Sequence, residues 1–212
     1  MTARRLFLVR HGQVDFTSRE YRTSPRGRQW DPPLGERGRE QVELLTARLL
    51  RLNEPLAIFS SPFRRCVETI EPYAEAIGIK MMLYEDLGEV YMAEWEGKSF
   101  EEMVAGDEDL ARRFREQEVL FSLSGGESGE ELRRRVHPAV ESILSLQSTG
   151  DVAIVAHGGV INAYVTAVMG FDHDMLFGPD NTSLSIIAVD ADLREVRFLN
   201  DVRHLTTPEM FR

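Results

Sequence analysis

The chain of 212 residues is 42% hydrophobic and 28% charged, which is an ordinary composition for one domain with one core. Its formal net charge of -10 argues against nucleic acid or an anionic membrane as the main partner, because both favour a basic surface. Cys66 is the only cysteine, which excludes an internal disulfide, and the apolar run near the start is too short for a signal peptide or a membrane span. We therefore expect a cytoplasmic protein with a single domain over residues 1–212.

The first part of the chain alternates apolar runs with helical patterns. Residues 6–9 form a short apolar run that predicts a buried strand, and this strand ends at Arg10 and His11. Apolar residues at helical spacing then predict an amphipathic helix over 35–52. A second apolar run at 56–59 precedes Ser-Ser-Pro, a typical helix start, and the next helix should extend to about Ile77.

The second part of the chain repeats this alternation after an irregular region. A third short run covers 80–84, and helical patterns follow at 100–116 and 127–146, which we interpret as a helical insert over about 98–147. A fourth apolar run at 152–156 leads through glycines into a buried helix over 160–169. Two last runs, 183–189 and 196–199, flank Asp-Ala-Asp and predict a hairpin at the edge of the sheet.

Strands that alternate with helices indicate crossover connections, which place helices on both faces of a mostly parallel sheet. The predicted fold class is therefore α/β, a single three-layer domain in which the hairpin supplies an antiparallel edge strand.

Basic residues follow three of the predicted parallel strands. Arg10 and His11 end the first strand, Arg64 and Arg65 follow the second, and His157 follows the fourth. In open α/β sheets ligands bind beyond the carboxyl ends of the strands, and guanidinium groups match phosphate oxygens in charge and geometry. The sequence contains neither a glycine-rich nucleotide loop nor a His or Cys motif for metal, so the histidines are the candidates for chemistry on a phosphate.

The segment LVRHG at residues 8–12 resembles the R-H-G signature of the histidine phosphatase superfamily, whose fold is phosphoglycerate-mutase-like. Further matching segments follow in the family's order: Asp31-Pro32-Pro33-Leu34 with Gly38, Ser60-Ser61-Pro62 with Arg65 and Thr69, Leu87-Gly88-Glu89 with Trp95-Glu96-Gly97, and Ala156-His157-Gly158-Gly159. Gly125-Gly126-Glu127-Ser128 resembles a segment of the phosphatase branch.

This resemblance implies roles for five residues. His11 attacks phosphorus, while Arg10, Arg65 and His157 hold the equatorial oxygens and Glu89 is the general acid. The adjoining Gly12 and Gly158 are expected to bind phosphate as well. The arginine charges beside His11 favour its neutral, nucleophilic form. The arginines also supply the positive charge that Mg²⁺ gives in other phosphoryl transferases, so we expect neither a metal nor a cofactor.

The predicted activity is that of a metal-independent phosphomonoester hydrolase, an enzyme that acts through a phosphohistidine on a small phosphorylated metabolite. Two alternatives stay open: phosphoglycerate mutase-type transfer, and a non-catalytic module that binds a phosphorylated ligand. Only 68 positions separate Glu89 from His157, shorter than the insert of the mutases, which favours hydrolysis. The sequence specifies neither the substrate nor the oligomeric state, for which a homodimer is one option.

The segment 15–30 departs from the usual family pattern, in which an asparagine often stands at Thr17 and a hydroxyl residue at Val14. It is rich in arginine within an acidic chain. We interpret it as a mobile loop whose Arg22 and Arg26 bind a second anionic group on the substrate.

Overall fold

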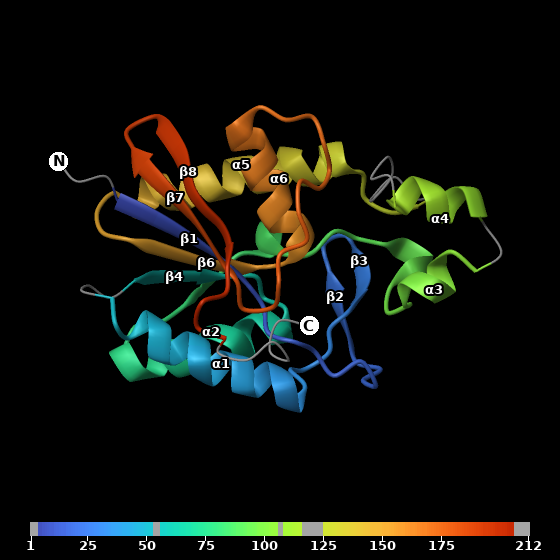
Figure 1. Ribbon diagram of the computed structural model, residues 1–212, viewed down its shortest axis with the longest axis horizontal. Helices are drawn as coiled ribbons and strands as arrows, with labels where there is room; N and C mark the ends of the chain where they lie inside the picture. Colours follow the sequence, from blue (N-terminus) through green and yellow to red (C-terminus); the bar gives the residue numbers. More distant parts are fainter. Residues whose placement is uncertain (1–3, 53–55, 106–107, 116–124, 206–212) are drawn as a thin grey trace.

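A computed structural model describes residues 4–52, 56–105, 108–115 and 125–205 (Figure 1). Its central sheet has six strands in the order β5-β4-β6-β1-β7-β8. The strands are β1 (Arg4–Arg10), β4 (Ala57–Ser60), β5 (Met82–Leu83), β6 (Val152–Ala156), β7 (Leu184–Asp190) and β8 (Leu193–Asp201). Each of the apolar runs singled out in the sequence therefore overlaps one strand of this sheet.

The pairing of the strands agrees with the predicted fold class. β1, β4, β5 and β6 are parallel, while β7 pairs antiparallel with both β1 and β8. The β7–β8 hairpin occupies one edge of the sheet, as predicted. The fold is thus α/β with a mostly parallel sheet.

Two pairs of helices cover the two faces of the sheet (Figure 1). α1 (Glu36–Leu49) and α2 (Arg64–Ile77) lie on one face, and α5 (Gly129–Leu146) and α6 (Gly158–Met169) lie on the other. Alternate residues of β1 serve the two cores, because Leu6 and Leu8 pack with α5 and α6 while Phe7 and Val9 pack with α1 and α2. A strand that is buried on both faces has to be apolar throughout, which explains the continuous run at 6–9.

The helical region at 98–147 divides differently from the prediction. α5 begins with a capping box between Ser128 and Glu131, and its apolar face belongs to the core that covers the sheet. The pattern at 100–116 forms two short helices, α3 (Phe100–Met103) and α4 (Glu108–Arg115), instead of one. Between them the sequence contains Gly106, outside the described residues, and glycine is unfavourable inside a helix. The insert that lies outside the sheet and its covering helices is therefore shorter than 98–147.

The arginine-rich segment 15–30 contains a hairpin that the sequence analysis did not predict. β2 (Tyr21–Ser24) pairs antiparallel with β3 (Gly27–Trp30), and Pro25 and Arg26 form the turn. Gly27 has a φ of 139°, a conformation that L side chains rarely adopt. The strands carry polar residues on both faces, so no apolar alternation marks them.

The chain between β5 and α3 contains two 3₁₀ turns, η1 (Glu85–Leu87) and η2 (Ala93–Trp95), and it runs beside the β2–β3 hairpin. Among the described helices, none is long and apolar enough to cross a membrane.

Candidate active site

The carboxyl ends of the parallel strands bring the two family histidines together. Arg10 pairs with Ala156 in the β1–β6 register, so His11 and His157 follow neighbouring strands at the same level. Their ring centroids lie 5.2 Å apart in an edge-to-face arrangement. The backbone N–H of His11 also donates to the carbonyl of Ala156, over 3.1 Å, which fixes the loop after β1 to β6.

His11 is held with one ring nitrogen engaged. Its Nδ1 lies 2.8 Å from the carbonyl oxygen of Gly12, so Nδ1 carries the proton that is donated and Nε2 keeps its lone pair. Burial, followed by the charges of Arg65 and Arg10, lowers the pKa of His11 well below its usual value. A neutral imidazole with a free Nε2 is the form required of a nucleophile.

Hydrogen bonds between side chains and the backbone hold the loop that carries His11. Asn181 Nδ2 donates to the carbonyl of His11 over 2.9 Å, and the N–H of Gly12 donates to Thr69 Oγ1 over 2.9 Å. Thr69 belongs to the family pattern, whereas no sequence signal pointed to Asn181.

Arg10 and Arg65 approach His11 from two different elements. Arg10 donates through Nη1 to the carbonyl of Pro179, and its buried Nε has no hydrogen-bond partner among the described residues. Arg65, on the first turn of α2, is 6% exposed and donates to the carbonyl of Trp30 over 3.1 Å. A buried donor without a partner is costly, which makes Arg10 Nε a group that an anion in the cavity would satisfy.

The neighbouring Arg64 points elsewhere. Its guanidinium pairs with Glu20 and Glu68 at 2.8 and 2.6 Å, and its side chain is 48% exposed. Of the two adjacent arginines, Arg65 lines the cavity beside His11 and Arg64 does not.

His157 is fully buried behind His11. Its Nε2 lies 2.8 Å from Ser61 Oγ, and its ring packs edge-to-face against Phe63. Burial, followed by the charges of Arg65 and of His11, lowers its pKa well below the usual value. The structure places His157 next to the nucleophile candidate but not on the surface of the cavity. Gly158 follows as the first residue of α6, and a Cβ there would lie 4.0 Å from Arg10 Nε.

Glu89 lies on the segment after η1 and lines the same cavity. Its Oε1 accepts a hydrogen bond of 3.0 Å from the N–H of Val90. Burial raises the pKa of Glu89 above the usual value, against the opposing effects of the Val90 N–H and of Arg65 and Arg10. A raised pKa keeps a carboxyl protonated at a higher pH, as a general acid requires.

These side chains surround a cavity of about 230 Å³. Arg10, His11, Arg65 and Glu89 line it together with apolar and aromatic residues. The apolar and aromatic residues are Val14, Phe16, Trp30, Phe63, Val90, Met92 and Trp95. Lys98 contributes a further cation, and Gln29, Glu96, Gly97 and Asn181 complete the lining. Four of the five residues to which the resemblance assigns roles therefore share one cavity, and His157 is the exception. Phe16, Gln29, Met92 and Lys98 also line the cavity, although no signal in the sequence linked them to it.

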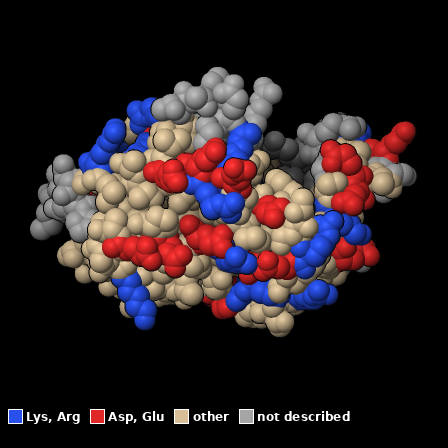
Figure 2. All heavy atoms as spheres, turned by 90° about the horizontal axis from the view of Figure 1, so that it is seen from below, with Lys and Arg blue, Asp and Glu red and all other residues tan. Residues whose placement is uncertain are grey.

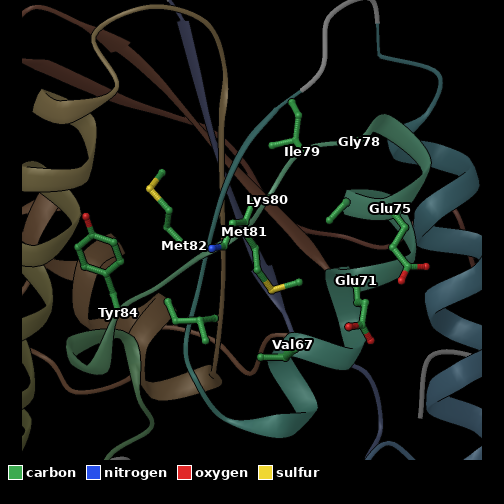
Figure 3. A pocket seen from close by; sticks show the side chains of 11 residues that line it. Val67, Glu71, Glu75, Gly78, Ile79, Lys80, Met81, Met82 and Tyr84 are labelled. Atoms are coloured by element: carbon green, nitrogen blue, oxygen red, sulfur yellow. The ribbon is translucent and has the colours of Figure 1, made fainter.

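A larger hollow of about 970 Å³ lies at the β5 edge, between α2 and residues 78–84 (Figure 3). Its charged side chains are Glu71, Glu75 and Lys80, and none of the candidate residues lines it. The candidate residues Arg10, His11, Arg65 and Glu89 line the smaller cavity and not this hollow.

Arg22 and Arg26 do not line the cavity. Arg22 forms a bidentate ion pair with the Glu85 carboxylate, with N–O distances of 2.8 and 3.0 Å. Arg26 donates a hydrogen bond of 2.7 Å to the backbone carbonyl of Glu85. Acidic and basic residues also lie next to one another over the face of the molecule seen in Figure 2. The binding of a second anionic group by these arginines stays a prediction; in the structure they connect the β2–β3 hairpin to η1.

No group of three or more His, Cys, Asp or Glu residues suited to a metal ion occurs in the described part of the chain. The cationic side chains that line the cavity are Arg10, Arg65 and Lys98.

Comparison with known proteins places the chain in a family. The profile of the histidine phosphatase superfamily, branch 1, matches residues 6–202. Phosphoserine phosphatase 1 of Hydrogenobacter thermophilus is 30% identical, over 95% of this chain and 94% of that protein. Glucosyl-3-phosphoglycerate phosphatase of Mycolicibacterium vanbaalenii is 31% identical, over 86% of this chain and 83% of that protein.

A solved structure, YhfR of Bacillus stearothermophilus, superposes with a TM-score of 0.81 at 30% identity and covers 95% of this chain and 99% of that chain. Other curated relatives, from Mycobacterium, are 32% identical over 96% of this chain, but the chain spans only 56% of their length.

Proposed function

The chain belongs to the histidine phosphatase superfamily, and from this premise we propose that it is a phosphomonoester hydrolase in which His11 carries the phosphoryl group. The observation that supports this most strongly is the state of His11. Its Nδ1 is committed to the carbonyl of Gly12, while its lowered pKa keeps the ring neutral and Nε2 unprotonated. A dianion between Arg10 and Arg65 would present its phosphorus to that nitrogen.

The proposed reaction has two steps. In the first, Nε2 of His11 forms a bond to phosphorus while the bond from phosphorus to the ester oxygen breaks, and Glu89 gives its proton to the departing alkoxide. In the second, Glu89 takes a proton from water, whose oxygen attacks phosphorus and breaks the nitrogen–phosphorus bond. Inorganic phosphate leaves, and both residues return to their starting states.

The arginines supply the charge stabilisation in this scheme. The transferring phosphoryl spreads negative charge over three oxygens, and fixed donors near those oxygens lower the barrier. Arg10 and Arg65 line the cavity, and His157 lies directly behind His11. We expect catalysis to need no added metal ion.

The substrate class we propose is a small phosphorylated metabolite. A cavity of about 230 Å³ suits a phosphate with a modest leaving group. Two relatives are named for the hydrolysis of phosphoserine and of glucosyl-3-phosphoglycerate, so these esters are the first to test.

The test is an assay of phosphate release in EDTA from p-nitrophenyl phosphate, phosphoserine, glucosyl-3-phosphoglycerate and 3-phosphoglycerate. The intact protein should turn over, and His11→Ala should lose at least about 10³-fold in kcat. Rapid quenching with a ³²P-labelled ester should trap an acid-labile, alkali-stable phosphoprotein in the intact protein alone. Isomerised phosphoglycerate without phosphate release would instead indicate a mutase, and binding without turnover would indicate a phospho-ligand module.

A further inference from the structure

We propose that Gln29, on β3, is a positioning residue that aims the Glu89 carboxyl into the cavity. This inference rests on the proposed function, because it assigns Glu89 the role of proton donor. Gln29 lies outside the motifs that identify the family, and it comes from the hairpin that the sequence did not predict.

The side-chain amide of Gln29 is buried, with 1% of the residue exposed. Its Nε2 donates to the carbonyl of Glu89 over 3.1 Å and contacts the carbonyl of Val90 at 3.4 Å. Its Oε1 accepts a hydrogen bond of 2.6 Å from Ser24 Oγ. Because both ends of the amide are bound, its orientation is fixed.

These bonds act on the peptide unit that orients the Glu89 carboxyl. Oε1 of Glu89 accepts from the N–H of Val90, which belongs to the peptide whose carbonyl Gln29 holds. Rotation of that peptide would carry the carboxyl with it. The carboxyl also accepts a hydrogen bond from the backbone of Gly159, on α6. Gln29 therefore contributes to the direction of the proton donor through the backbone, without contact to the carboxylate.

Arg135, on α5, donates a second hydrogen bond to the same carbonyl. Its Nη2 donates to Glu89 O over 3.2 Å, its Nη1 donates to Asp86 O over 2.6 Å, and its remaining donors pair with Glu127. The Glu89 carbonyl is thus held between the hairpin and the sheet-covering helix. Gln29 supplies the hairpin's hydrogen bond to this carbonyl and lines the cavity. Arg22 and Arg26 connect the hairpin to η1 and do not line the cavity.

The test exploits the dependence of acid catalysis on the leaving group. An alkoxide must be protonated as it departs, whereas p-nitrophenolate leaves well without help. Gln29→Met keeps the length of the side chain and removes the hydrogen bonds. It should lower kcat for an alkyl phosphate by about 10- to 100-fold, as expected for a misplaced catalytic group, and for p-nitrophenyl phosphate by no more than a few-fold. KM for either ester should change little.

Gln41→Met is the matched control, because Gln41 is also 1% exposed and accepts from a backbone N–H, that of Gln13, away from Glu89. It should lose stability comparably and keep the wild-type ratio of the two activities. Equal losses on both esters in Gln29→Met, or a rise in KM alone, would overturn the positioning role.

A second measurement separates this inference from the proposed function. The Glu89 carboxyl is titrated by ¹³C NMR without substrate, with Glu89→Gln used for assignment. In Gln29→Met the pKa of Glu89 should fall toward its usual value, because a loosened segment admits water to a carboxyl whose pKa burial raises. An unchanged pKa of Glu89 in Gln29→Met would overturn the role of Gln29, even if the protein has no phosphatase activity. A lowered pKa of Glu89 in a protein without phosphatase activity would support the role of Gln29 and contradict only the proposed function.

Discussion

The inner and the outer walls of the cavity are built in different ways. The inner wall comes from the end of β1 and from the first turn of α2, and His157 at the end of β6 lies behind it, so Arg10, His11, Arg65 and His157 are placed by the sheet and its cores. The outer wall comes from the β2–β3 hairpin and residues 84–98, which side-chain hydrogen bonds hold together. Backbone pairing fixes the inner wall, which is the proposed phosphate end, and individual polar contacts fix the outer wall, which is the proposed leaving-group end. The inner wall should therefore govern phosphoryl transfer to every ester, and the outer wall should govern the choice among esters.

The largest expected effect on the outer wall is that of Glu89→Gln. It should lower kcat for an alkyl phosphate by about 10²- to 10⁴-fold, the usual contribution of general acid catalysis, and much less for p-nitrophenyl phosphate. Burial raises the pKa of Glu89, and its protonated form is the donor, so wild-type activity on alkyl esters should fall as the pH rises through that pKa. The pKa of His11 is lowered, so its neutral form should persist well below pH 6.5.

A pH profile of kcat/KM for both esters checks this prediction. Glu89→Gln should remove the alkaline limb seen with the alkyl ester. A limb that persists in the variant would assign it to another group.

The inner wall is tested by the two adjacent arginines. Arg65→Met should lower kcat/KM by about 10²- to 10³-fold on all esters alike, because Arg65 is a buried donor beside His11. Arg64→Met removes the same charge from a side chain that is 48% exposed and paired with Glu20 and Glu68, and it should change activity by less than about 3-fold. Steady-state kinetics of both variants decides the point, and equal losses would contradict the structural assignment.

Gly38, on α1, packs closely against the loop that carries His11. A Cβ at this position of α1 would overlap the carbonyl oxygen of Gln13, two residues after His11. Gly38→Ala should therefore destabilise the fold by about 1–3 kcal/mol and displace the His11 loop, with reduced kcat on all esters. Gly178→Ala, where an added Cβ meets nothing within 4 Å, is the control and should change neither. Urea unfolding measures both variants, and equal stability would contradict the prediction.

The smallest effect is expected for Arg22→Met combined with Arg26→Met. The Arg22–Glu85 pair is partly exposed, so its loss should lower stability by less than about 1 kcal/mol. If the arginines only fasten the hairpin to η1, KM should change equally for singly and multiply charged esters. A selective rise in KM for multiply charged esters would instead support their predicted binding of a second anionic group.

The parts of the fold that the sequence predicted correctly share a physical cause. Buried parallel strands must be apolar throughout, so β1, β4 and β6 were visible as apolar runs, whereas the two residues of β5 are exposed. α1 was visible from its amphipathic spacing, α2 from its start signal, α5 from a helical pattern and α6 as an apolar stretch that is buried along most of its length. The hairpin β2–β3 was missed because its strands are short and polar on both faces. The break between α3 and α4 was missed because helical spacing alone does not mark a helix end.

For the candidate site, the sequence by itself determined the family and predicted the residues of the proposed phosphate end. Local order fixes these: each of Arg10, His11 and His157 sits at the end of an apolar run, and parallel strands bring such ends together. The resemblance also selected Arg65 over Arg64, and the cavity lining agrees with it. Only the tertiary structure decided that Arg22 pairs with Glu85 and that Gln29 holds the Glu89 carbonyl. Each of these contacts joins two segments that are far apart in the chain through a single side chain. The hydrophobic pattern or motif of one segment contains no information on where the other segment lies.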